Sequence, residues 1–155
     1  MFKWLLRGQS PRDYIDLLLS LKHAPNVTLC DFPHMVASHV NKRKANFLRP
    51  FEGRVHPPTD QNIELFENGR LEPISLPFLE SCNPAIIPIF ELDPSVHPQS
   101  LLASRYCLYD MFHDGNTKQK KEKLRSPLLV KELVRTNTET SEQTNEMISK
   151  HLSIG

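Results

Sequence analysis

The chain has 155 residues, a length that predicts one domain or a large part of one. Its longest apolar run, residues 85–90, is broken by a proline and is far shorter than the roughly 18 residues of a membrane span. Three cysteines without a C-x-x-C pair exclude a disulfide framework and a cysteine-rich zinc module, and they favour a reducing compartment. Arg7 interrupts the apolar start before a signal peptide could form, so secretion is not expected.

The net charge is +1, but its sign changes along the chain. Residues 1–50 carry 8 Lys/Arg and 3 Asp/Glu, residues 51–98 carry 2 and 8, and residues 99–155 carry 9 and 7. Nine of the 13 prolines lie between Pro50 and Pro98, and this part of the chain is therefore predicted to hold neither regular helix nor a central strand. The basic flanks permit contact with nucleic acid without requiring it.

The N-terminal third predicts a helix, a strand and a second helix. Ser10 and Pro11 form a helix start, and the helix should end by Pro25. Residues 26–31 read as a buried strand that ends on Asp31, and Pro33 can open the next helix. The predicted inner faces are Tyr14, Leu17, Leu18 and Leu21 on the first helix, and Met35, Val36, His39 and Val40 on the second.

The rest of the chain gives weaker signals. Residues 59–68 predict a short helix capped by Thr59, while 71–79 and 85–90 predict edge strands or loops. Residues 101–112 fit a helix or a strand, and we favour the helix; 117–125 predict a solvated loop or helix start. Residues 128–134 form a short apolar element, and 139–152 predict a last helix capped by Thr138. One convincing strand cannot form a sheet, so its partners lie in the middle segment or outside this sequence.

Asp31 is the first candidate for chemistry, because a carboxylate at the end of a buried strand is held rigidly at the edge of an α/β sheet. The alternative is that Asp31 caps the following helix. Glu142, in the predicted last helix, is an ordinary solvated acid when considered alone. Together the two carboxylates could bind Mg²⁺ for phosphoryl transfer, although no acid of the middle segment stands in a comparable strand-end context.

Other polar residues offer less specific signals. Cys30, His34 and His39 invite a zinc site, but the two histidines are five positions apart, so hydrogen-bonded structural histidines are favoured. The lysine-rich residues 118–123 fit a nuclear-localisation or phosphate-contacting patch, or simply a solvated loop. Motifs for serine or cysteine nucleophiles and for nucleotide-binding loops are absent from the sequence.

Three stretches carry a family resemblance: PNVTLCDFPHMVASHVNKRKANFLRPFEGRVHPPT, SRYCLYDMFHDGNTKQKKEKLR and NTETSEQTNEMISKH. In order and spacing they resemble the C-terminal part of KDZ (Kyakuja, Dileera, Zisupton)-type transposon-derived proteins, including the HMG domain-containing protein 3-like proteins. The resemblance covers roughly residues 10–150. No HMG box is present in the sequence.

The resemblance implies an α/β, helix-rich part of an RNase H-like transposase domain, in which three acids hold divalent metal. Asp31 would be the second acid and Glu142 the last, with the first acid upstream of Met1. His34 stands where family members commonly have cysteine. Residues 1–44 would form the helix-strand-helix core, 45–125 the proline-rich insertion and 126–155 the C-terminal helical part.

We therefore expect a transposase-derived remnant, nuclear and without cleavage activity of its own, with Mg²⁺ as the possible cofactor and DNA as the possible partner. No membrane and no small-molecule substrate are expected. The candidate DNA contacts are Lys42, Arg43, Lys44, Lys118, Lys120 and Lys121. One alternative is a non-catalytic protein-interaction domain in which Asp31 is merely a cap. Another is a half-domain that is not stable alone.

Overall fold

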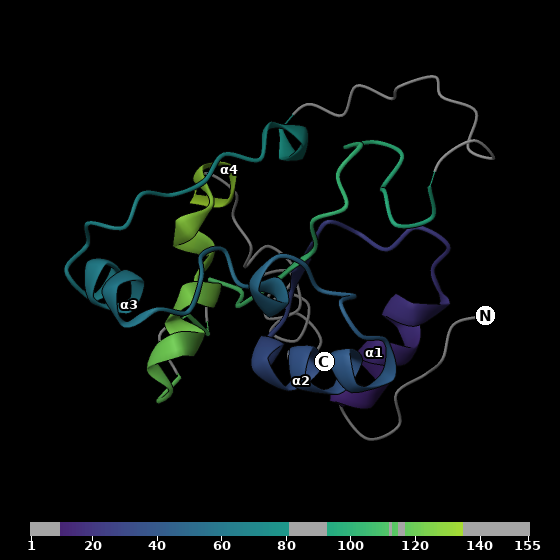
Figure 1. Cartoon of the computed structure of the whole chain (residues 1–155), viewed down its shortest axis with the longest axis horizontal. Helices are drawn as coiled ribbons and strands as arrows, with labels where there is room; N and C mark the ends of the chain where they lie inside the picture. Colours follow the sequence, from purple (N-terminus) through teal and green to yellow (C-terminus); the bar gives the residue numbers. More distant parts are fainter. Residues whose placement is uncertain (1–9, 81–92, 112, 115–116, 135–155) are drawn as a thin grey trace, which may run out of the picture.

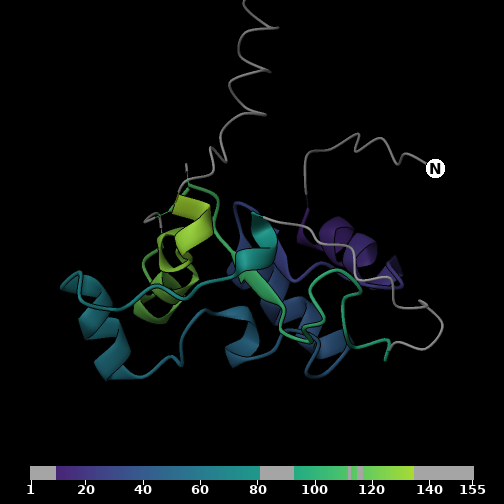
Figure 2. The same cartoon turned by 90° about the horizontal axis from the view of Figure 1, so that it is seen from above.

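The computed structural model describes residues 10–80, 93–111, 113–114 and 117–134. Two short parallel strands, β1 (Val27–Leu29) and β2 (Tyr106–Leu108), lie at its centre. Helices α1 (Pro11–Ser20) and α2 (Pro33–Arg43) pack against each other. Helix α3 (Asp60–Glu67) and helix α4 (Lys131–Val134) lie on the other side of the molecule (Figures 1 and 2).

The sheet separates two apolar clusters, as alternating side chains of a strand require. Cys107 packs with α1 and α2, whereas its neighbours Tyr106 and Leu108 pack with the opposite cluster. That opposite cluster gathers side chains from α3, α4 and the intervening turns, among them Val55, Ile63, Leu124 and Val130. The strands thus form a thin central layer between the two clusters. Because the strands are parallel, their carboxyl ends lie at the same edge of the sheet.

Local helix signals correctly predicted where α1, α2 and α3 begin. Ser10 caps α1 by accepting a hydrogen bond from the Asp13 backbone N–H, and Thr59 caps α3 by accepting one from Asn62. Lys42 and Arg43 occupy the last turn of α2, where positive charge complements the helix dipole. No helix of the described residues is long and apolar enough to cross a membrane.

The predicted helix faces were partly wrong. On α1 the buried residues are Ile15 and Leu18, whereas Leu17 is 60% exposed and Leu21 is 44% exposed. On α2, Ala37 is buried with the predicted Val36 and Val40, while Met35 and His39 are exposed. The reason is that α1 and α2 pack against each other and α2 also packs against β2, and sequence periodicity alone does not specify these contacts.

The preference for a helix at 101–112 was also wrong, because this segment supplies β2. Val27 pairs with Tyr106, Thr28 with Cys107 and Leu29 with Leu108. The predicted partner strand therefore lies in the middle of the chain, within the residues interpreted as an insertion. Farther along, Ile74 forms a parallel bridge with Val130, which agrees with an extended edge piece at 71–79.

Residues 117–125 are not merely a solvated loop. The 3-10 helix η4 (Lys120–Arg125) exposes its first two lysines but buries Glu122, Leu124 and Arg125. Arg125 is only 1% exposed, so it belongs to the interior and does not face solvent as part of the predicted basic segment. The helix predicted at 139–152 lies outside the described residues.

Candidate functional site

Asp31 does not cap α2. The N-cap position is Phe32, and α2 has no side-chain cap hydrogen bond. The Asp31 side chain is 44% exposed, two positions beyond the end of β1. The structure thus agrees with the predicted strand-end position and rejects the capping role.

A second aspartate occupies the same position on the neighbouring strand. Asp110 follows the end of β2 by two residues, as Asp31 follows β1. Because Leu29 and Leu108 are partners in the parallel sheet, the two aspartates extend from the same edge. The sequence reasoning compared Asp31 only with the acids of the middle segment, residues 51–98, and it overlooked Asp110 because β2 was not recognised as a strand.

His113 completes the group. Its Nδ1 lies 2.9 Å from Asp110 Oδ1 and 3.6 Å from Asp31 Oδ1. One potential ligand atom from each of Asp31, Asp110 and His113 lies within 4.8 Å of the others. We call these three residues the strand-end triad.

Hydrogen bonds already organise the strand-end triad. The backbone N–H of His113 donates to Asp110 Oδ1 at 2.7 Å, which closes the turn after β2. Partial burial alone would raise the pKa of Asp110, but hydrogen bonds with His113 and Asp31 outweigh it and lower that pKa. The lowered pKa favours the carboxylate form of Asp110, which is the form that binds a cation.

Glu142, the predicted partner of Asp31, lies outside the described residues. In the described part of the chain, the carboxylate that accompanies Asp31 is Asp110. The sequence missed both Asp110 and His113. For Asp110 a signal existed, since Tyr106 to Asp110 repeats the pattern of Val27 to Asp31, an apolar run that ends on aspartate.

The zinc interpretation of Cys30, His34 and His39 gains no support from the geometry. A hydrogen bond with Cys107, on the adjacent strand, is the main cause that lowers the pKa of Cys30. His34 Nδ1 lies 3.0 Å from the Tyr109 hydroxyl, and His39 is exposed. Among the described residues, the possible metal ligands converge at the strand-end triad instead.

The predicted DNA-contacting residues lie in two separate segments, one at the end of α2 and one at the start of η4. Lys42, Lys44, Lys118, Lys120 and Lys121 are exposed. Arg43 is engaged, because its Nη1 lies 2.6 Å from Asp16 Oδ1 on α1. The Lys44 ammonium lies 5.6 Å from the centroid of the Phe47 ring.

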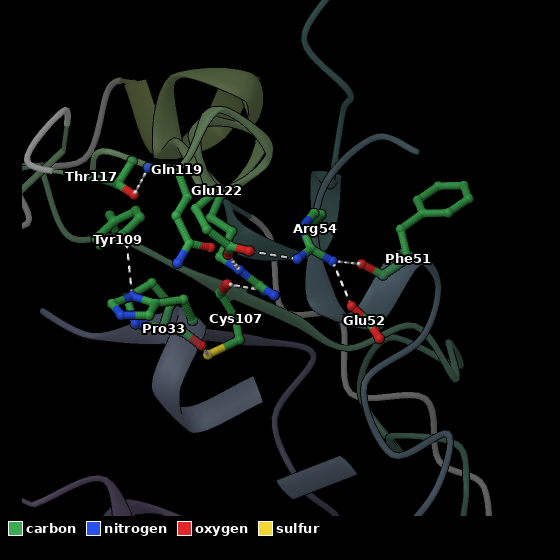
Figure 3. A network of polar contacts seen from close by, with 11 residues as sticks. Pro33, Phe51, Glu52, Arg54, Cys107, Tyr109, Thr117, Gln119 and Glu122 are labelled. Carbon is green, nitrogen blue, oxygen red and sulfur yellow. Dashed lines mark hydrogen bonds and ion pairs between the residues drawn. The ribbon is translucent and has the colours of Figure 1, made fainter. Parts of the chain in front are cut away.

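A network of buried charged side chains joins η4 to Arg54. Arg54 donates to Glu122 Oε1 at 2.6 Å, and Arg125 donates to Glu122 Oε2 and, at 3.1 Å, to the Cys107 carbonyl. Figure 3 shows Arg54 between Glu122 on one side and Phe51 and Glu52 on the other. Burial would raise the pKa of Glu122, but the attraction of Arg125 and hydrogen bonds from both arginines outweigh it and lower that pKa.

No family model, no curated protein and no solved structure matches the chain.

Proposed function

We propose that the chain is a transposase-derived domain that binds a divalent cation at the strand-end triad and contacts DNA through its exposed lysines. The observation that carries the proposal is the placement of Asp31 and Asp110 at equivalent positions after two paired parallel strands. The RNase H-like, KDZ-type relationship remains part of the proposal and rests on the resemblance described above. In the proposal, Asp110 and His113 join Asp31 as metal ligands.

The chemistry of the strand-end triad favours a cation. Two carboxylates in close proximity repel each other when both are ionised, and a divalent ion relieves that repulsion. Carboxylate oxygens are the usual ligands of Mg²⁺ and Mn²⁺, and an imidazole ligand makes Mn²⁺ the better probe. The proposal is limited to cation binding, which the two convergent carboxylates of the described residues support.

A melting experiment tests the cation site. Mn²⁺ and Mg²⁺ are titrated into the purified chain, and the melting temperature is followed by circular dichroism. A cation at ten times its Kd should stabilise the folded chain by about 1.4 kcal/mol, because it binds only the folded state. Asp31→Asn and Asp110→Asn should abolish the rise in melting temperature.

The matched control for this experiment is Glu64→Gln, which neutralises an exposed carboxylate on α3. Glu64→Gln should respond to the cation as the unaltered chain does. A cooperatively folded chain without any metal response would reject the cation site. If Asp31→Asn, Asp110→Asn and Glu64→Gln all show the same rise in melting temperature, the cation binds nonspecifically to surface charge.

The DNA contact is proposed for Lys118, Lys120 and Lys121. Replacing all three with alanine should reduce the slope of log affinity against log salt by about 0.9 for each phosphate contact that is lost. Fluorescence anisotropy of a labelled duplex measures this slope. Lys22→Ala, at an exposed lysine beyond α1, is the control; an unchanged slope in the triple variant would contradict the contact.

The proposal includes a nuclear location, with residues 118–123 as the import signal. A fluorescent fusion should lose nuclear enrichment when Lys118, Lys120 and Lys121 are replaced together. Equal distribution of both fusions would reject this part of the proposal.

A protein-interaction domain is the second candidate function. It is favoured by Leu17 and Leu21, which lie one turn apart and are 60% and 44% exposed. In this case Asp31→Asn would change neither partner binding nor the response to metal.

A further inference from the structure

The two edges of the sheet differ in how they are covered. Strand β2 is buried along its whole length, whereas all three residues of β1 are half-buried. On the side of β2 that faces away from β1, the Cys107 carbonyl accepts a hydrogen bond from Arg125 at 3.1 Å. The accessible edge of the sheet is therefore that of β1.

The backbone groups of β1 alternate between the two sides of the strand. The Asn26 carbonyl accepts a hydrogen bond from the Tyr106 N–H at 2.7 Å, so positions 26 and 28 face β2. The N–H and C=O groups of Val27 and Leu29 therefore point away from β2. Within the part of the chain that the structure describes, these four groups form no hydrogen bond.

Unpaired backbone groups along an accessible strand form a template for another strand. Proteins commonly protect such an edge with charged side chains or with proline, and residues 26–30 carry neither. A sheet of two strands is also small, since sheets usually contain about four to six strands. The edge of β1 is thus suited to receive a further strand.

We propose that the edge of β1 pairs with the same edge of a second copy of the chain, antiparallel about a two-fold axis through Thr28. In this register Val27 lies opposite Leu29 of the second copy, and Leu29 lies opposite Val27 of the second copy. Each opposed pair exchanges two hydrogen bonds, so the four outward groups of both copies are all satisfied. The edge is therefore complementary to itself, as a two-fold interface requires.

The side chains of the paired segment favour a second copy as the occupant. Thr28 lies directly opposite its own counterpart, and pairs of threonines across antiparallel strands are stabilising. Because residues 26–30 are uncharged, the two-fold axis brings no like charges together within the paired segment. The product is a sheet of four strands in the order β2, β1, β1, β2, which is a common size.

The dimer is independent of the strand-end triad. The register places Asp31 opposite Pro25 of the second copy, so the two triads lie at opposite ends of the paired strands. Failure of the cation site would leave this proposal intact, and measurements in EDTA keep the two apart experimentally.

The test combines sedimentation equilibrium of the full chain with amide hydrogen exchange followed by nuclear magnetic resonance. At concentrations at which the dimer forms, the N–H groups of Val27 and Leu29 should exchange more slowly than in the dilute chain. The N–H of Cys30 is the internal control. It donates to the Leu108 carbonyl at 3.1 Å within one copy and should be protected at every concentration.

Thr28→Lys and Thr28→Gln are the matched variants. Both give the half-buried Thr28 a long unbranched side chain, and only lysine adds charge. Thr28→Lys places two ammonium groups opposite each other and should weaken dimerisation about fivefold relative to Thr28→Gln. The difference should shrink at high salt. If either variant fails to fold by circular dichroism, the exchange of Val27 and Leu29 in the unaltered chain decides.

A chain that stays monomeric at every concentration would overturn the proposal. A dimer in which Val27 and Leu29 exchange as fast as in the dilute chain would overturn it too, because another surface would then form the interface. Protection of both N–H groups in a monomer would assign the edge to a strand of the same chain and would equally reject the second copy.

Discussion

Replacing Glu122 with glutamine should be among the most destabilising single changes in the chain. The substitution preserves the size of the side chain but leaves two buried guanidiniums, those of Arg54 and Arg125, without their shared counterion. Removing one partner from a buried ion pair costs about 3–5 kcal/mol. That is a large share of the roughly 5–15 kcal/mol by which domains are stable.

Urea unfolding followed by far-ultraviolet circular dichroism measures the effect. Glu52→Gln is the matched control, since Glu52 also pairs with Arg54, at 2.8 Å, but is 66% exposed. It should cost no more than about 1 kcal/mol. A cost for Glu122→Gln no greater than that of Glu52→Gln would refute the reasoning, because the two carboxylates would then be equivalent despite their different burial.

The same variant has a pH signature. The pKa of Glu122 is lower in the folded chain than its ordinary value of 4.5. Its contribution to stability is therefore complete above the unfolded value and is lost as the pH falls through the folded value. The stability difference between the unaltered chain and Glu122→Gln should shrink between neutral pH and pH values below about 4.5.

Three further predictions test caps, turns and packing, each by urea unfolding. Ser10→Ala should cost about 1 kcal/mol, because it removes the side-chain cap of α1; no loss would mean that the cap is not formed in solution. Gly53→Ala should cost more than Gly69→Ala, since both residues have positive φ but a Cβ at Gly53 would meet Cys107 N at 3.1 Å, whereas Gly69 faces open space. Leu18→Ala should cost about 2–5 kcal/mol and Leu17→Ala less than about 0.5 kcal/mol; equally large costs for both would favour the face predicted from the sequence, which contains both leucines.

The helices were predictable because their signals are local. A capping side chain and a proline at the first turn act within four residues, so Ser10 with Pro11 and Thr59 each marked a helix start correctly. The buried faces were less predictable. Ile15 is inside and Leu17 outside because α1 is positioned by α2, a contact between residues far apart in sequence.

The buried charge network could not be predicted from its own segment. Glu122 and Arg125 stand in a run of lysines, and such a run usually lies in solvent. Their burial depends on Arg54, which is 68 positions away from Glu122 and supplies the second guanidinium. A sequence pattern confined to residues 117–125 contains no trace of that partner.

The strand-end triad was predictable from the sequence only in part. Val27 and Tyr106 are partners in the sheet, and each is followed four positions later by an aspartate, so parallel pairing in this register places Asp31 beside Asp110. Recognising β2 in the sequence would have been enough to predict the carboxylate pair. His113 would still have been missed, because the turn that returns its imidazole to Asp31 is closed by Asp110 itself. The positions of the two carboxylates therefore depend on the pairing of β1 with β2. The position of the His113 imidazole depends instead on the local turn that Asp110 closes.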